Sequence, residues 1–171
     1  MKARMKEPTS IRTVGTLALL IVSGLALAAS REPVSVSGQV DLNTFEGTAT
    51  VTIPGQQLEG TVQVIPLAPP EPKDGGLYFP VVEHWFMFPD AENPTDILIT
   101  TGEELAMPTD ENPAVYTLHG NMEIIAESAQ PEEGPSATGQ FQGVSGELRV
   151  NGQMDFSVGQ ATFEAHGTIS R

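Results

Sequence analysis

His84 is the residue best placed to do chemistry in this chain of 171 residues. It lies in the aromatic segment 77–88 (LYFPVVEHWFMF), where an extended backbone would place it on one face with Val82, Phe86 and Phe88. An imidazole on such an apolar face would be partly desolvated, and it could orient a ligand or transfer a proton near neutral pH. A hydrogen-bonded histidine at the rim of a barrel would give the same pattern, since apolar sites seldom leave an imidazole unpaired.

The same segment supplies the side chains expected to line a ligand cavity. These are Phe79, Val82, His84, Phe86 and Phe88. The opposite face of the segment, which includes the single tryptophan, Trp85, is also mainly apolar. A strand that is apolar on both faces is expected to be covered on both sides or to line a cavity.

The other two histidines, His119 and His166, fall on the polar faces of their predicted strands, beside Glu123 and Glu164. If those strands were neighbours, two imidazoles and a carboxylate could hold a metal ion. Solvent-facing residues explain the same pattern, and no metal-ligand spacing supports a site. We therefore predict no metal.

Other chemical motifs are missing from the sequence. The acidic clusters 90–96 and 110–112 offer oxygens to Ca²⁺, but neither has the spacing of a calcium-binding loop, so solvated turns are expected. There is no G-x-S-x-G nucleophile turn, and serines next to glycine, such as Ser145, have no base beside them. Phosphate-binding and dinucleotide-binding glycine loops are absent from the sequence too, so no cofactor is expected.

The elements that must position His84 are strands. An alternation of apolar and polar residues with period two predicts them at 34–42, 48–53, 58–64, 77–88, 96–101, 115–126, 148–156 and 161–169. Stretches rich in proline, glycine or polar residues predict loops at 66–76, 102–114 and 128–138, with a helical turn possible at 103–106. The fold class expected is all-β, in one domain covering 31–171. About eight short strands suggest a barrel or sandwich, and an antiparallel barrel is favoured because closure leaves no exposed edge.

The first thirty residues have the layout of a secretory signal. A basic start is followed by an uncharged, mostly apolar run at 13–29 that ends in small residues, so cleavage is expected after Ala28 or Ser30. An uncleaved membrane anchor is the alternative, although the run is near the lower limit for spanning a bilayer. The protein is accordingly expected to be secreted or periplasmic, with no membrane contact after cleavage.

Charge and composition exclude several partners. The chain has 22 acidic and 8 basic residues, a net charge of −14, and four of the bases lie in the first twelve residues. Such a surface repels nucleic acid and anionic lipid. There is no cysteine, which excludes disulfides and thiolate chemistry.

One stretch resembles a known family. Residues 138–146 (TGQFQGVSG) are similar to the TGxFxGxxG signature of bacterial relatives of the allene oxide cyclase and dirigent barrels, and the resemblance extends over 115–169. It implies a barrel in which this stretch precedes an antiparallel hairpin. It also implies either cyclisation of an unstable fatty-acid epoxide or steering of radical coupling, without a cofactor. The glycines would serve a tight bend around a core Phe141 in any small barrel.

Three functions remain open at this point. The first is binding of a small apolar ligand in the barrel interior or mouth. The second is a cofactor-free cyclase or isomerase, and the third is a structural or adhesive domain with a filled core, with homo-oligomers possible in each case. A binder or enzyme should show a cavity of at least about 300 Å³, and a filled barrel should show none.

Overall fold

The structure, a computed structural model, describes residues 30–89, 96–130 and 134–171. Its strands are β1 (Arg31–Asp41), β2 (Glu46–Ile53), β3 (Gln56–Pro66), β4 (Glu71–Lys73), β5 (Gly76–Phe88), β6 (Asp96–Pro108), β7 (Val115–Ile125), β8 (Ser145–Asp155) and β9 (Gln160–Ser170). A single 3₁₀ turn, η1 (Gly139–Phe141), precedes β8.

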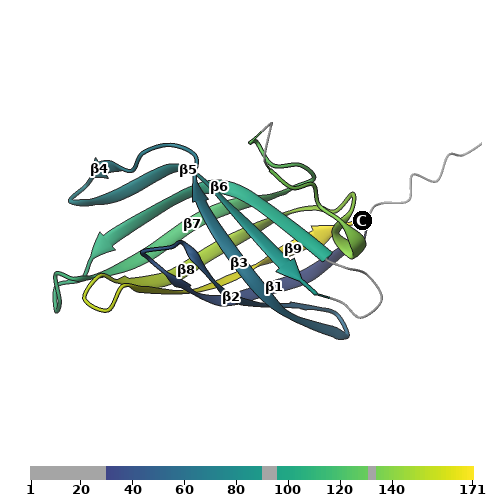
Figure 1. Cartoon of the computed structure of the whole chain (residues 1–171), viewed down its shortest axis with the longest axis horizontal. Helices are drawn as coiled ribbons and strands as arrows, with labels where there is room; N and C mark the ends of the chain where they lie inside the picture. Colours follow the sequence, from purple (N-terminus) through teal and green to yellow (C-terminus); the bar gives the residue numbers. More distant parts are fainter. Residues whose placement is uncertain (1–29, 90–95, 131–133) are drawn as a thin grey trace, which may run out of the picture.

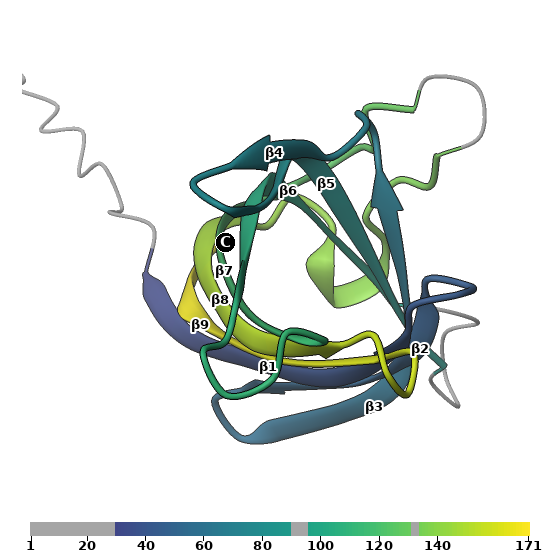
Figure 2. The same ribbon diagram turned by 90° about the vertical axis from the view of Figure 1, so that its left-hand side faces the viewer.

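The strands close into one antiparallel barrel. They pair in the order β3-β2-β1-β9-β8-β7-β6-β5-β4, and a further pairing of β3 with β5 joins the two ends of the sheet. The short β4 pairs with β5 alone and lies outside the ring (Figures 1 and 2). A closed barrel of eight antiparallel strands confirms the predicted fold class and decides between barrel and sandwich.

Side chains alternate between the two faces of the sheet, as the sequence predicts. In β9, Ala161, Phe163 and Ala165 are buried while the residues between them are exposed. Within the barrel the Phe86 ring lies against Phe88 and Phe163, with centroids 6.5 and 6.2 Å apart. The middle of the barrel is therefore filled by packed aromatic rings.

One end of the barrel is closed by the segment 138–146. Gly139 has a positive φ of 60°, which a glycine adopts without strain. The turn it makes directs Phe141 inward, where its fully buried ring lies 5.9 Å from that of Phe88. At Gly146 a side chain would collide with the backbone of β9. The bend around a core Phe141 is thus confirmed, and Figure 2 shows η1 within the outline of the barrel, behind its open end.

Two boundaries differ from those expected. Residues 102–108 were expected in a loop, but they form the second half of β6, paired without interruption to β7 as far as Pro108. Pairing with a neighbouring strand outweighs the low strand propensity of glycine and glutamate in this stretch. The expected loop 66–76 contains β4, which pairs back onto β5.

The predicted signal segment, 1–30, lies outside the described residues except for Ser30. The acidic cluster 90–96 is described only at Asp96. Among the residues that the structure describes, no helix is long and apolar enough to cross a membrane.

Candidate functional site

A β-bulge sets the position of His84. The register between β5 and β6 shifts between Phe79 and Val82, at Pro80, which has no amide hydrogen to give to the ladder. Strict alternation would place Phe79 and Val82 on opposite faces. The bulge turns both inward, and His84, Phe86 and Phe88 follow on the same face.

His84 faces a second titratable residue inside the barrel, Glu104 of β6. The His84 Nε2 atom lies 3.5 Å from Glu104 Oε1, and both side chains are buried, with 7% and 6% of their surface exposed. The other ring nitrogen, Nδ1, is 3.4 Å from Thr100 Oγ1. Glu104 Oε1 is buried and has no hydrogen-bond partner.

Burial shifts the pKa values of His84 and Glu104 in opposite directions. Desolvation lowers the pKa of His84 from 6.5 to about 4 and raises the pKa of Glu104 from 4.5 to about 7. His84 is therefore neutral near pH 7, where its contact with Glu104 is not an ion pair. Glu104 changes its charge in the same pH range, as a general acid or base does.

The pair lies at the base of a small apolar cavity. Its enclosed volume is about 40 Å³, room for a water molecule or two. Val40, Leu42, Phe45, Val64, Pro66, Phe79, Val82, His84, Glu104, Leu118, Met154, Ala161 and Phe163 line it. Of the five residues predicted to line a ligand cavity, Phe79, Val82 and His84 lie together around this one, whereas Phe86 and Phe88 lie deeper in the packed core.

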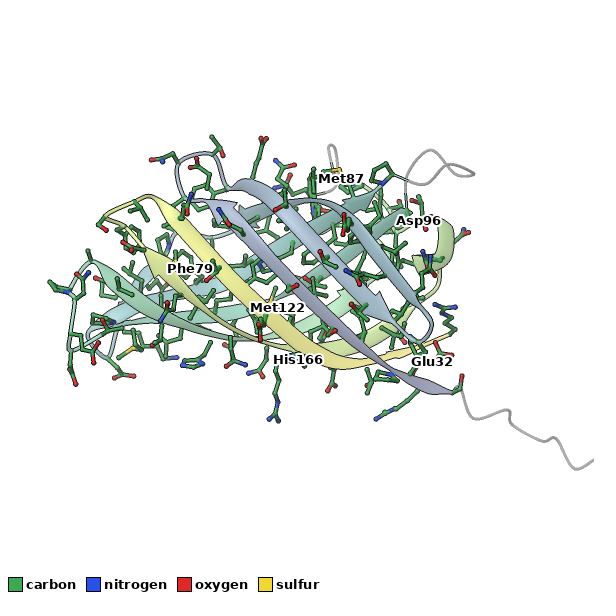
Figure 3. The ribbon with its side chains drawn as sticks, turned by 90° about the horizontal axis from the view of Figure 1, so that it is seen from below. Glu32, Phe79, Met87, Asp96, Met122 and His166 are labelled. Atoms are coloured by element: carbon green, nitrogen blue, oxygen red, sulfur yellow. The ribbon has the colours of Figure 1, made fainter. Side chains whose placement is uncertain are left out.

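This cavity opens at the end of the barrel opposite η1. Its lining residues lie near the C-terminal ends of β1, β3 and β8 and near the N-terminal ends of β5, β7 and β9. These strand ends all lie on that side of the barrel (Figure 1). Figure 3 labels Phe79 and Asp96 toward opposite ends of the barrel. The turns that ring the open end carry three exposed hydrophobic side chains, Phe45, Phe156 and Val158.

Three larger depressions, of about 470, 600 and 680 Å³, lie on the outer face of the sheet. They are wide open and lined by mixed, mainly exposed residues. Volume alone therefore does not select the site. The narrower, mainly apolar cavity with two buried titratable groups is the better candidate.

A second buried carboxylate, Glu83, points the other way and has a different environment. It lies on the outer face of β5 under an outer loop (residues 126–130 and 134–138). Its Oε2 accepts hydrogen bonds from Trp85 Nε1 at 2.8 Å and Ser128 Oγ at 2.7 Å. Its Oε1 accepts one from the Ala129 amide at 2.7 Å. Glu83 thus anchors the outer loop, which covers part of the outer face of β5, while Val81 on the same face stays exposed.

The other histidines do not form a site. His119 lies on β7 and His166 on β9, and β8 separates these strands. His119 Nδ1 is 2.9 Å from Asn151 Oδ1, and His166 lies 3.8 Å from Glu164. Within the described ranges, no group of three or more potential ligands is placed to hold a metal ion.

Glu104 is not among the residues predicted to form a site, because the sequence predicts a loop at 102–114. A signal for it was present. Leu98, Thr100, Gly102, Glu104 and Ala106 continue the period of two that begins β6. If this alternation is continued past Gly102, it predicts that Glu104 lies on the inner face.

Comparisons with known proteins do not place the chain in a family. No protein-family model, curated protein or solved structure matches it. The residues of the site and their geometry are therefore the basis on which a function is proposed.

Proposed function

We propose that this protein is an exported β-barrel that binds a small, mainly apolar molecule at the open end of the barrel, with Glu104 and His84 as its polar anchor. The proposal of export comes from the signal-like segment 1–30. The proposal of binding comes from the cavity.

One observation carries the binding proposal. Glu104 is buried in an apolar cavity, yet its Oε1 has no hydrogen-bond partner. Burying a polar atom without a partner costs about 1–3 kcal/mol, so such atoms are rare in cores that serve stability alone. A ligand that donates a hydrogen bond to Glu104 would remove this penalty.

The size of the cavity limits how the ligand sits. An enclosed volume of about 40 Å³ is far below the 300 Å³ or so of a pocket that encloses a whole ligand. Only a small polar head reaches Glu104, and the apolar body lies in the mouth against side chains such as Leu42, Phe45 and Val64. The small volume also favours the competing proposal, a filled barrel with a structural role.

Titration with 1-hexanol, followed by amide NMR shifts, separates these two proposals. Binding at the open end is expected to shift the amides of Leu42, Leu118 and Met154, and to leave Val144 at the closed end unchanged. Ala161→Leu fills the cavity from β9 and is expected to weaken binding about tenfold or more. Its control is Thr162→Leu, which adds the same side chain on the exposed face next to it. A structural barrel would show no saturable shifts, or shifts that Ala161→Leu leaves unchanged.

A second candidate function is a cofactor-free isomerase or cyclase, the activity that the resemblance to the allene oxide cyclase and dirigent barrels implies. The specific observation in its favour is the pKa of about 7 at Glu104, next to a neutral imidazole. A carboxylate with this pKa can take a proton from a carbon acid at neutral pH more readily than an ordinary one.

Exchange of the α-protons of hexan-2-one in D₂O tests this candidate. Glu104 as its carboxylate would take an α-proton and leave an enolate; after the carboxyl proton exchanges with D₂O, the deuteron would return to the same carbon and regenerate the ketone and the carboxylate. The rate is expected to rise with pH and to level off above about pH 7, and to be lost in Glu104→Gln. Exchange no faster than in buffer at matched pH would exclude the isomerase and leave the binding proposal standing.

A further inference from the structure

Few polar groups line the cavity. Of the side chains that line it, only His84 and Glu104 are polar, and none belongs to Lys, Arg, Ser, Thr, Asn or Gln. The neutral His84 has one N–H to donate, and its ring nitrogens lie 3.4 Å from Thr100 Oγ1 and 3.5 Å from Glu104 Oε1. The cavity can therefore accept hydrogen bonds at Glu104, but it offers almost nothing to an acceptor such as a carboxylate or phosphate.

The surroundings of the cavity are negative as well. The turns that ring the open end carry Asp41, Asp110, Glu111 and Asp155. Hydrogen bonds from Asn43 hold the pKa of Asp41 below its ordinary value, and hydrogen bonds from Ser157 do the same for Asp155. Both are thus fully charged near neutral pH, and with a net charge of −14 the field at the mouth favours cations.

Apolar and aromatic surface lies between this acidic rim and Glu104. Phe45 and Phe79 line the cavity, and Phe156 lies exposed on the neighbouring turn. Ring faces attract cations, and the aliphatic side chains Leu118 and Met154 offer contact to a hydrocarbon tail. The enclosed volume of about 40 Å³ suits a head group of roughly the size of a water molecule.

We propose that the ligand is a small cationic amphiphile, an alkyl- or arylammonium compound whose N–H groups donate to the buried Glu104 carboxylate. This inference rests on the proposed function and names its ligand class. The unpartnered Oε1 of Glu104 is the anchor, and the acidic rim draws the cation to the mouth. Ligands with an acidic head are excluded, because they would bring a second negative charge to an unpaired carboxylate.

The affinity should depend on pH through Glu104. Its pKa is about 7, and an ammonium head favours the ionised form, so binding is strongest above that pH and weakens below it. Among the cavity-lining residues, β5 contributes one other titratable group, His84, which stays neutral down to about pH 4. The lining residues from β1, β3, β7, β8 and β9 are apolar.

Three probes with the same tail test the inference by calorimetry on the full chain: n-hexylammonium chloride, 1-hexanol and sodium hexanoate. At about pH 8 we expect hexylammonium to bind at least tenfold more tightly than hexanol, and hexanoate not to bind. Lowering the pH to about 5 should weaken hexylammonium binding at least tenfold. The same fall in pH should weaken the binding of hexanol much less.

Two variants localise the effect. Glu104→Gln keeps the size of the side chain and removes its charge, and it should weaken hexylammonium binding about tenfold more than it weakens hexanol binding. Glu123→Gln removes one charge from the exposed face of β7 and should change neither.

The outcomes separate the two proposals. Hexanol binding as tightly as hexylammonium, or hexanoate binding most tightly, overturns the ammonium inference and leaves the apolar binding site in place. Equal losses of hexylammonium affinity in Glu104→Gln and Glu123→Gln also overturn it, because the preference for the cation would then come from the overall charge of the protein. If none of the three probes binds, the proposed function fails, and the ammonium inference fails with it.

Discussion

Replacing Glu104 with methionine is expected to make the barrel more stable at pH 8, by about 3 kcal/mol. The folded-state pKa of Glu104, about 7, lies above its ordinary 4.5, so the folded protein holds this proton more tightly than the unfolded chain does. As the pH rises from 4.5 through 7, the unfolded chain gives up the proton first and stability is lost. Methionine has a similar size and carries no charge, so it removes this loss.

The gain should depend on pH, and urea unfolding at pH 8 and pH 4.5 measures it. At pH 4.5 and below, Glu104 is protonated in the folded protein, so the advantage of Glu104→Met should shrink to the small effect of repacking. The control is Glu123→Met, on the exposed face of β7, which should change stability by less than about 0.5 kcal/mol. A Glu104→Met variant that is less stable at pH 8, or equally stabilised at both pH values, would contradict the unpaired buried carboxyl.

If the same variant also loses binding of hexylammonium and hexanol, Glu104 is kept for function against its effect on stability. Such a conflict between stability and activity is common at binding and catalytic sites. It would also argue against a filled barrel with a purely structural role, for which the stabilised variant would be the better protein.

The opposite result is expected at the other buried carboxylate. Glu83→Ala should destabilise the protein by about 3 kcal/mol, because it removes three hydrogen bonds together, two of which hold the outer loop to β5. The Ala129 amide donates to Glu83 directly, so its protection from hydrogen exchange should fall with the loss of stability.

Glu127→Ala is the control for this change. It lies in the same outer loop, is exposed, and should alter stability by less than about 0.5 kcal/mol. Thermal or urea unfolding gives the free energies, and hydrogen exchange gives the local effect. If Glu83→Ala unfolds at the same denaturant concentration as the parent protein, with the Ala129 amide still protected, Glu83 does not anchor the loop.

Glu83 and Glu104 differ in their hydrogen-bond partners, and this difference could not be predicted from the sequence. Both are glutamates in strands of the structure, next to apolar residues, and neither is singled out by the sequence. Glu83 meets Trp85 on its own strand and two further donors, Ser128 and Ala129, because residues 126–130, more than forty positions away, fold back over it. Glu104 Oε1 has no hydrogen-bond partner, because apart from His84 the other side chains that line the cavity come from apolar positions of other strands.

Much of the fold was nevertheless predictable. The period of two placed Val82, His84, Phe86 and Phe88 on one inner face, because successive side chains of a strand must alternate. The glycines of 138–146 predicted a tight bend around Phe141, since glycine alone adopts its backbone angles without strain.

The sequence by itself determined that this chain forms an all-β domain, and that His84 lies on one inner face with Val82, Phe86 and Phe88. Only the tertiary structure decided that His84 meets Glu104, that Phe86 and Phe88 fill the core instead of lining the cavity, and that the open end lies opposite η1. The reason is physical. Alternation fixes the face of each residue from local geometry, whereas depth, neighbours and enclosed volume depend on strand register and on the closure of β3 onto β5.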